Sequence, residues 1–422
     1  MDYKEALDYI ESIGHFGSKP GLSRVTELLE KLGNPQKGLK YVHVAGTNGK
    51  GSCAAMTASV LKAAGYRTGL FTSPYLYRFN ERMQINGKDI EDDALAKLVE
   101  RVKPLAEAMD DHPTEFEIIT AAAFLWYKEE KCDVVVLEVG LGGRFDATNI
   151  IGAPEVAVIM NIGLDHTEIL GDTVEKIAFE KAGIIKPGCD VVLYQQQESV
   201  IDVVRARCGE VGAKLRVADF SAIEPEFDSM FGQTFRYKGE PYALPLLGAH
   251  QLRNAAVVLE VVEALRERGW KLEQSDVEHG IYAVNWPGRF ELICEEPLFV
   301  VDGGHNPQCA QTVAENLLRY FPDYRRVILL GILRDKDYAE LTDIIDPTAD
   351  EYVCITPDSP RALPAVELAE HLAKYGKPVT VCGSIRDGVE AAVKAASGDG
   401  DMVCALGSLY SVGEIRACFE KY

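Results

Sequence analysis

Tyr41-Val-His-Val-Ala-Gly-Thr-Asn-Gly-Lys-Gly-Ser52 is an apolar strand-like run that passes through a glycine-rich turn into a helix-like run, residues 52–64. Glycines let the backbone approach phosphates with its N–H groups turned inward, the helix N-terminus adds partial positive charge, and Lys50 adds a point charge. The stretch therefore predicts a phosphate-binding loop. Its expected nucleotide contacts are Gly46, Thr47, Asn48, Gly49, Lys50, Gly51 and Ser52.

The loop departs from the common pattern G-x-x-x-x-G-K-[ST]. Val44 stands where the first glycine would be, and Gly51 separates Lys50 from Ser52. A glycine turn that only joins a strand to a helix is the weaker interpretation. The form G-T-N-G-K-G-S resembles the loop of the Mur-ligase superfamily and, with its extra glycine, that of the folate branch.

Strand-like apolar runs alternate with helix-like amphipathic runs along most of the chain, which is typical of a parallel sheet covered by helices. The first series of strand candidates is 41–45, 68–72, 133–139, 156–162 and 190–194. The second series is 298–302, 326–332, 351–356, 378–382 and 401–406. Between them, residues 218–247 are rich in Pro, Gly and aromatics and predict a small antiparallel insert.

The chain is therefore predicted to be an α/β protein of two domains. Its 422 residues exceed the size at which a single hydrophobic core stops growing. We expect residues 1–295 to form a P-loop mononucleotide-binding domain with a mainly parallel sheet and the antiparallel insert. Residues 296–422 are expected to form a smaller Rossmann-like α/β domain.

Composition excludes several classes of partner. The formal net charge of -21 would repel a nucleic-acid backbone, and it also requires that ATP be held by Mg²⁺, local lysines and backbone amides. No apolar run is long enough to span a membrane, and the N-terminus has no secretion signal, so we expect a cytoplasmic protein. The ten cysteines form no C-x-x-C pair and are interpreted as reduced thiols.

Three polar residues are predicted to meet at the edge that carries the loop. Glu138 lies near the end of strand candidate 133–139, Ser73 follows 68–72, and His166 follows 156–162. Ligands of open parallel sheets bind outside the carboxyl ends of the strands, and Mg²⁺ prefers hard oxygen ligands. Each residue alone could be a turn or cap residue. The glycines after Glu138 do not match a dinucleotide fingerprint, which argues against a nicotinamide-dependent oxidoreductase.

Ordered motifs along nearly the whole chain resemble the folylpolyglutamate synthase and dihydrofolate synthase family. They are Leu32-Gly-Asn-Pro-Gln36, the phosphate loop, Thr72-Ser-Pro74, Asn80-Glu-Arg82, Phe116-Glu-Ile-Ile-Thr120, Glu138-Val-Gly-Leu-Gly-Gly-Arg144, Asp146-Ala-Thr-Asn149, Leu164-Asp-His166, Glu180-Lys-Ala-Gly183, Gly248-Ala-His-Gln251, Trp286-Pro-Gly-Arg289, Asp302-Gly-Gly-His-Asn-Pro307 and Asp335-Lys-Asp337. Tyr75 and Gly304 depart from the family pattern, which usually has a histidine and an alanine there.

The resemblance implies roles for further residues. The metal ligands for two Mg²⁺ ions would be Ser73, Glu138, His166 and a carbamylated Lys181. Without the family, Lys181 would be interpreted as a surface helix lysine. Further nucleotide contacts would be Asn254, Arg289, Asp302 and His305. Contacts to the folate would come from Arg82, Glu117, Asp146 and Ala147.

The expected reaction is the ATP-dependent ligation of L-glutamate to a folate carboxylate through an acyl phosphate. Lys50, Lys181, His166 and Arg289 are the expected catalytic residues. Dihydropteroate is a second expected acceptor, and a monofunctional enzyme is the alternative. A monovalent cation is a further candidate cofactor, and a monomer is expected.

Two other functions stay open at this point. A cell-wall Mur ligase would usually carry an additional N-terminal domain, and only about forty residues precede the loop, too few for a domain. A regulatory ATPase that uses the loop as a switch would hydrolyse ATP regardless of folate and glutamate.

Overall fold

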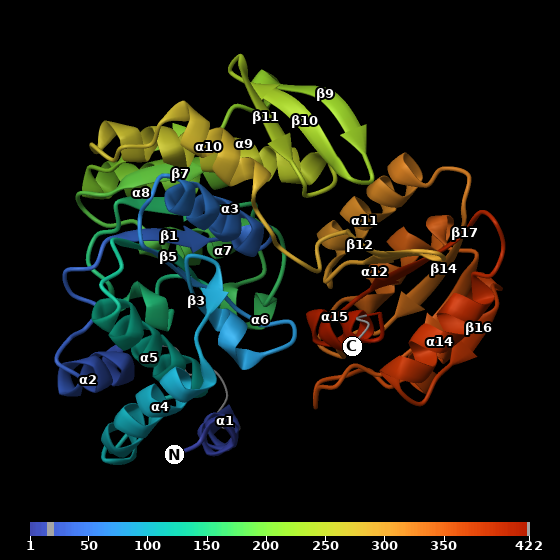
Figure 1. Cartoon of the computed structure of the whole chain (residues 1–422), viewed down its shortest axis with the longest axis horizontal. Helices are drawn as coiled ribbons and strands as arrows, with labels where there is room; N and C mark the ends of the chain where they lie inside the picture. Colours follow the sequence, from blue (N-terminus) through green and yellow to red (C-terminus); the bar gives the residue numbers. More distant parts are fainter. Residues whose placement is uncertain (15–20, 420–422) are drawn as a thin grey trace.

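The computed structural model describes residues 1–14 and 21–419, which form two α/β domains with a small three-stranded sheet between their upper ends (Figure 1). The larger domain runs from the N-terminus through α10 (Gln274–Tyr282), which follows the antiparallel insert, and the red and orange C-terminal part makes the smaller domain. Within the described residues, no helix is both long and apolar enough to cross a membrane.

The sheet of the first domain has eight strands in the order β4-β3-β2-β5-β1-β6-β7-β8. Its strands are β1 (Tyr41–Ala45), β2 (Thr68–Phe71), β3 (Met83–Ile85), β4 (Lys88–Asp89), β5 (Val134–Glu138), β6 (Val156–Ile159), β7 (Asp190–Leu193) and β8 (Lys214–Val217). The strands from β2 to β8 in this order pair in parallel, whereas β3 and β4 are antiparallel. The predicted, mainly parallel sheet is confirmed.

The side chains of β1 point alternately to the two faces of the sheet, so the core of this domain has two layers. Val42 and Val44 pack on one face, beneath α3, α9 and α10, while Tyr41 and Ala45 pack on the other. The helices of the first face are α3 (Lys50–Ala63), α9 (Ala249–Glu267) and α10 (Gln274–Tyr282). Those of the second are α1 (Tyr3–Ile13), α2 (Ser23–Lys31), α4 (Asp92–Glu107), α5 (Glu115–Glu129), α7 (Val174–Lys181) and α8 (Glu198–Val211).

The predicted antiparallel insert is also confirmed. It consists of β9 (Ile223–Ser229), β10 (Gly232–Tyr237) and β11 (Glu240–Leu244) in the order β11-β10-β9. Asp228 at the end of β9 accepts a hydrogen bond from the Tyr320 hydroxyl of the second domain at 2.7 Å and pairs with Arg319. The insert therefore links the first domain to the second.

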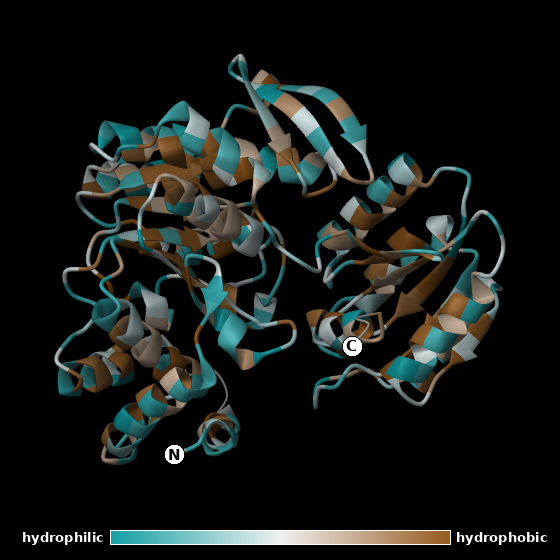
Figure 2. Cartoon of the chain, in the orientation of Figure 1, coloured by the Kyte–Doolittle hydropathy of each residue, from teal (hydrophilic) through white to brown (hydrophobic). Residues whose placement is uncertain are grey.

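The second domain has a six-stranded sheet in the order β12-β13-β17-β14-β15-β16. Its strands are β12 (Glu291–Glu295), β13 (Leu298–Val301), β14 (Arg325–Leu330), β15 (Glu351–Cys354), β16 (Val379–Val381) and β17 (Asp401–Leu406). Its helices are α11 (Pro307–Tyr320), α12 (Tyr338–Ile345), α13 (Ala365–Leu372), α14 (Ile385–Ala395) and α15 (Leu409–Ala417). Figure 2 shows the apolar strands enclosed between helices whose outer faces are hydrophilic.

One feature of this sheet departs from the predicted boundary after residue 295. β12 pairs antiparallel with β13, from Glu291 opposite Val301 to Glu295 opposite Leu298. The second sheet therefore begins at Glu291, before the predicted boundary. No strand was predicted at β12, because it is an edge strand with charged residues at both ends.

Candidate active site

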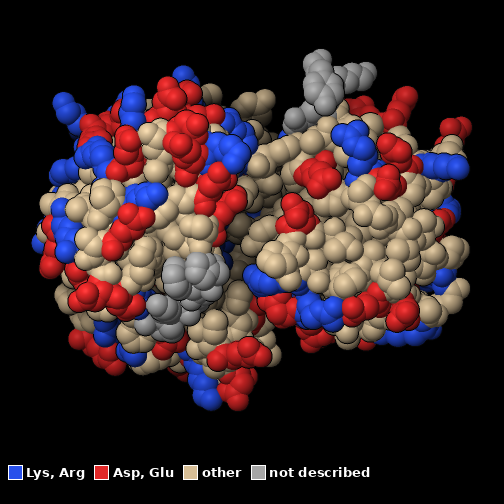
Figure 3. All heavy atoms as spheres, turned by 90° about the horizontal axis from the view of Figure 1, so that it is seen from below, with Lys and Arg blue, Asp and Glu red and all other residues tan. Residues whose placement is uncertain are grey.

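A cavity of about 360 Å³ lies where the carboxyl ends of both sheets face each other. Figure 3 shows the groove that separates the two domains, seen from below. The cavity is lined by the phosphate loop, by residues that follow β2, β5 and β6, by the start of α9, and by residues of the second domain that follow β13. The expected meeting of strand ends at one rim is thus observed.

The phosphate loop connects β1 to α3, and Lys50 is the first residue of that helix. Gly49 has φ +82°, a left-handed conformation that favours glycine, and a Cβ there would lie 2.8 Å from Asn254 Oδ1. At Gly51 a Cβ would meet the Trp286 ring at 2.7 Å. Both glycines therefore allow close approaches that no other residue would permit.

Glu138 is the only buried carboxylate among the predicted metal ligands. It ends β5, is 4% exposed and accepts a hydrogen bond from the Ser73 amide at 3.1 Å. Burial raises the pKa of the Glu138 carboxyl, and the positive charge of Lys50 acts against this. A buried carboxylate facing a lysine at the end of a strand is well placed to receive a cation together with phosphates.

Lys181 is buried, with 4% of its surface exposed, so its interpretation as a surface lysine is wrong. It ends α7, and its Nζ donates a hydrogen bond to the carbonyl of Gly46 at 2.8 Å. Burial, followed by the charge of Lys50, lowers the pKa of Lys181 to about 7. A large fraction of this amine is therefore neutral near pH 7, and the neutral amine is the form that can react with CO₂.

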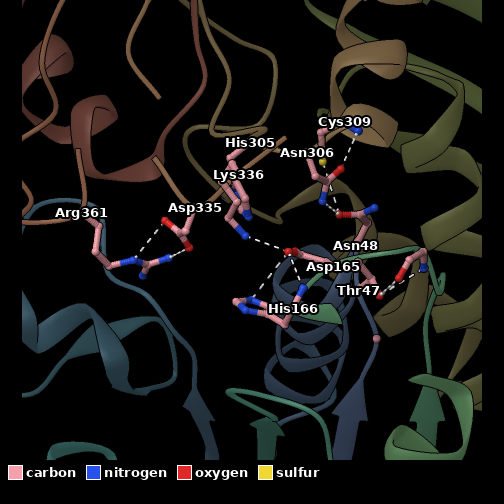
Figure 4. A network of polar contacts seen from close by, with 12 residues as sticks. Thr47, Asn48, Asp165, His166, His305, Asn306, Cys309, Asp335, Lys336 and Arg361 are labelled. Carbon is pink, nitrogen blue, oxygen red and sulfur yellow. Dashed lines mark hydrogen bonds and ion pairs between the residues drawn. The ribbon is translucent and has the colours of Figure 1, made fainter. Parts of the chain in front are cut away.

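His166 is the N-cap residue of α6 (Thr167–Leu170) and has a left-handed backbone, φ +51°. Its Nε2 lies 3.9 Å from Asp165 Oδ1, and the same oxygen accepts a hydrogen bond from Lys336 Nζ at 2.8 Å (Figure 4). Burial acts to raise the pKa of Asp165, but Lys336 and His166 outweigh it and bring the pKa to about 2. Asp165 and Lys336 thus form a shielded ion pair between the two domains.

The predicted residues of the second domain line the same cavity. Asp302 accepts hydrogen bonds from the amides of Phe290 at 2.8 Å and Gly304 at 2.6 Å, which fixes the turn after β13. Arg289 and His305 line the cavity beside it, and burial lowers the pKa of His305 to about 4. His305 of this turn and Arg289, which precedes β12, thus bring a neutral imidazole and a guanidinium to the cavity that the phosphate loop also lines.

The start of α9 completes the nucleotide side. Gln251 donates a hydrogen bond to the Ser52 hydroxyl at 3.3 Å and accepts one from Asn254 at 3.0 Å. Asn254 therefore lies beside the phosphate loop, as expected, although its amide already has one protein partner.

Asn48 lines the cavity, and its side chain also joins the phosphate loop to the second domain. Its amide donates to Gln308 Oε1 at 2.7 Å, and its Oδ1 accepts from Asn306 at 2.9 Å and from Cys309 Sγ at 3.3 Å (Figure 4). All three partners lie at the start of α11. The side chain of Asn48 thus fastens the phosphate loop to the second domain, and its backbone N–H donates a hydrogen bond to the Asn161 carbonyl at 3.3 Å.

None of the four residues expected to contact folate lines the cavity. Glu117 accepts hydrogen bonds from the Thr114 amide at 2.7 Å and from Arg24 at 3.0 Å, which makes it a helix-capping residue. Asp146 accepts from the amides of Leu141 at 2.9 Å and Thr148 at 3.0 Å.

Asp146 therefore holds the glycine turn after β5, and Ala147 is buried in the core of the first domain. Family spacing alone cannot distinguish such supporting residues from ligand contacts. Arg82, the fourth residue, lies near Ser73, because its carbonyl accepts a hydrogen bond from the amide of Thr72 at 3.1 Å.

The described residues contain no group of three or more His, Cys, Asp and Glu side chains that could hold a metal. A magnesium–nucleotide site needs no such group, because one or two carboxylates together with phosphate oxygens suffice. Glu138 and Ser73 supply oxygens beside the phosphate loop and fit this requirement. His166 and Lys181 fit a second site only when the buried amine carries a carboxylate group.

A strand, phosphate loop and helix facing a second α/β domain, with a carboxylate and a buried lysine between them, define an ATP-dependent Mur-type ligase. Residues 44–262 match the Mur ligase middle domain, and residues 288–409 match the glutamate ligase domain of Mur ligases.

Relatives and solved structures show which family of Mur-type ligases the chain resembles. The chain is 38% identical to the dihydrofolate synthase/folylpolyglutamate synthase of Bacillus subtilis, over 98% of each chain. It is 36% identical to the folylpolyglutamate synthase of Lacticaseibacillus casei, over 99% of this chain and 98% of the relative.

It resembles the structure of Mycobacterium tuberculosis folylpolyglutamate synthase complexed with ADP and AMPPCP, with a TM-score of 0.91, 33% identity and full coverage of both chains. It also resembles Escherichia coli FolC in complex with DHPP and ADP, with a TM-score of 0.86 and 31% identity over 99% of this chain and 97% of the other. The chain belongs to the folylpolyglutamate synthase and dihydrofolate synthase family.

Proposed function

We propose that this ligase joins L-glutamate to the carboxylate of a folate at the expense of ATP, and that it also accepts dihydropteroate. The observation that carries this proposal is the meeting of Lys50, Glu138 and Lys181 in one cavity with Arg289 of the second domain. Several relatives are named for both activities, which supports the second acceptor.

The chemistry follows from these residues. A carboxylate is a poor acylating agent at neutral pH, so ATP first converts it to an acyl phosphate, whose phosphate can leave. Lys50, Arg289 and the amides at the start of α3 face the cavity and would stabilise charge on the transferring phosphoryl group. Positioning and electrostatics supply most of the catalysis in such transfers.

Glu138 and Ser73 would hold one Mg²⁺, and His166 with carbamylated Lys181 would hold a second. A bound Mg²⁺ would neutralise charge on the phosphates and on the carboxylate that reacts. The burial of Lys181 and its hydrogen bond to Gly46 place its amine directly behind the phosphate loop. This position supports modification of Lys181 rather than direct binding of phosphate by its ammonium group.

The amine of the incoming glutamate would then attack the acyl carbon while the domains are closed. The contacts of Asn48 with α11 and of Asp165 with Lys336 close the cavity at the phosphate loop. Exclusion of water limits hydrolysis of the acyl phosphate. The proposal further includes a monomer, a cytoplasmic location and a monovalent cation as an additional cofactor.

The test is a measurement of ADP release by the purified protein with MgATP, L-glutamate and either tetrahydrofolate or dihydropteroate. We expect ADP release that requires both glutamate and an acceptor, and a product that is one glutamate heavier by mass spectrometry. ATP turnover that is indifferent to glutamate and acceptor would instead support a regulatory ATPase.

A further inference from the structure

Backbone hydrogen bonds hold Arg82 close to the proposed reaction centre. It ends the short 3-10 helix η2 (Phe79–Arg82), and its carbonyl accepts a hydrogen bond from the Thr72 amide at 3.1 Å. The next residue, Ser73, donates its amide to Glu138 at 3.1 Å. Two consecutive backbone amides therefore connect Arg82 to the carboxylate that is proposed to bind the metal.

The guanidinium of Arg82 is held but not neutralised. Its central carbon lies 5.2 Å from the centre of the Tyr75 ring and 5.4 Å from that of Phe79, so two aromatic rings fix its position. Its Nε is buried, and no residue that the structure describes forms a hydrogen bond with it. Across residues 1–14 and 21–419, no carboxylate lies within ion-pair distance of it, although Glu115 and Glu138 are near enough to influence it.

The other charged residues of the same turn have partners. Arg78 pairs with Asp92 at 2.6 Å on the surface, and Glu81 accepts hydrogen bonds from the amides of Leu76 at 2.7 Å and Tyr77 at 3.0 Å. A guanidinium stays protonated in proteins, and a buried charge without a partner is costly. Among the described residues, Arg82 is thus the charged residue of this turn that has no anionic partner.

The position of Arg82 relative to the domain interface also suits a ligand. Tyr410 of α15, in the second domain, is near enough to influence Arg82 and Tyr75. Pro74, Arg289 and Leu409 line both the main cavity and a neighbouring cavity of about 380 Å³ that also contains Tyr75. Glu81 and Gln84, which flank Arg82 in sequence, line this neighbouring cavity together with Tyr75, whose ring stacks on the Arg82 guanidinium.

We propose that Arg82 binds the α-carboxylate of the terminal glutamate of the folate acceptor, while the γ-carboxylate of the same residue reacts beside Glu138. This inference rests on the proposed function. A glutamylated folate has two carboxylates separated by three carbons, and only one of them reacts. Dihydropteroate has a single carboxylate, which is the reacting group, so it offers Arg82 no partner. Arg82 would therefore favour extension of folates over synthesis of dihydrofolate.

The geometry of arginine suits this role better than that of lysine. Its planar fork can donate two parallel hydrogen bonds to one carboxylate, and it can stack on the rings of Tyr75 and Phe79 at the same time. Lysine at this position would keep the charge but lose both features. A partial loss is thus expected for Arg82→Lys and a larger one for Arg82→Gln.

The experiment varies both the side chain at position 82 and the α-carboxylate of the acceptor. Wild-type protein and Arg82→Gln are assayed with tetrahydrofolate and with an analogue in which 4-aminobutyrate replaces glutamate, so that only the α-carboxylate is missing. Wild type should prefer tetrahydrofolate in kcat/KM by roughly 10- to 100-fold, the range for a hydrogen bond to a charged group, and Arg82→Gln should lose this preference. The loss should appear mainly in KM for the folate.

Three comparisons keep the outcomes distinct. Arg78→Gln, on the same turn but paired at the surface, should keep the preference for tetrahydrofolate. With dihydropteroate, Arg82→Gln should lose at least ten times less in kcat/KM than with tetrahydrofolate. Equal losses with all acceptors, or an unchanged preference for the α-carboxylate, would overturn the role of Arg82. Wild type that ligates glutamate to neither natural acceptor would instead refute the proposed function.

Discussion

At the scale of single residues, the sequence located the chemistry better than it located the supporting contacts. Glu138 and Lys181 were predicted from motifs, and both prove buried beside the phosphate loop. Glu117 and Asp146 come from equally recognisable motifs, yet their side chains cap a helix and hold a turn. A motif shows that a carboxylate matters, but only packing shows which groups it faces.

Lys181→Met should abolish ligation, because methionine fills the space but cannot carry a carboxylate group. We expect kcat to fall by at least about 100-fold with ATP binding retained, since a metal-site contribution of several kcal/mol is lost. The measurement is steady-state ADP release together with nucleotide affinity by calorimetry. Wild type in CO₂-depleted buffer should lose activity and regain it with bicarbonate, whereas the variant should not respond. Full activity without CO₂ would argue against carbamylation.

The stability of the protein should also respond to pH through Lys181. Its pKa is about 7 in the folded protein and higher, near the ordinary 10.5, when unfolded. Between these values the unfolded state binds the extra proton, so stability rises with pH, and the penalty is fully present below about pH 7. In CO₂-depleted buffer, the urea midpoint of wild type should increase from pH 6.5 to 9 relative to Lys181→Met. Parallel curves for the two proteins would contradict this assignment.

At the scale of elements, most central strands were predicted within a residue or two, whereas the edge strands β4, β8 and β12 were missed. The candidates 41–45 and 133–139 correspond to β1 and β5, which lie in the middle of their sheet and are apolar on both faces. The edge strands β4 and β12 lacked this signal because they are short or carry charges at their ends. A strand that is buried on both faces of its sheet has a continuous apolar run, which can be recognised in the sequence. An edge strand, which pairs with a neighbour on one side, need not have such a run.

The entry to α3 offers a prediction at this scale. Gly51→Ala would place a Cβ 2.7 Å from the Trp286 ring, so the ring or the helix must move. We expect a loss of about 1–3 kcal/mol in the free energy of unfolding and a higher KM for ATP. Gly209→Ala in α8, where nothing lies within 4 Å of the added carbon, should be neutral or slightly stabilising. Denaturant unfolding of both variants measures the difference, and similar values would show that Trp286 yields freely.

At the scale of the whole molecule, the contacts between domains could not be predicted from the sequence. The motifs that contain Asn306 and Lys336 were recognised, but no local pattern shows that they reach Asn48 and Asp165, more than 150 residues earlier. These contacts join loops that follow strands in different sheets. Their existence depends on how the two domains are placed, which only the structure shows.

Asn48→Ala should uncouple the phosphate loop from the second domain. Its three side-chain contacts with α11 would be lost, while the backbone that surrounds the phosphates stays. We therefore expect kcat to fall by about 10-fold or more with little change in ATP affinity, because the domains would spend less time closed. Small-angle scattering with a nonhydrolysable ATP analogue should show a larger radius of gyration than wild type. Gln311→Ala, on the same helix but exposed and hydrogen-bonded to Glu315, should behave like wild type. If Asn48→Ala instead loses ATP affinity and leaves the scattering unchanged, its side chain binds the nucleotide directly and domain closure depends on other contacts.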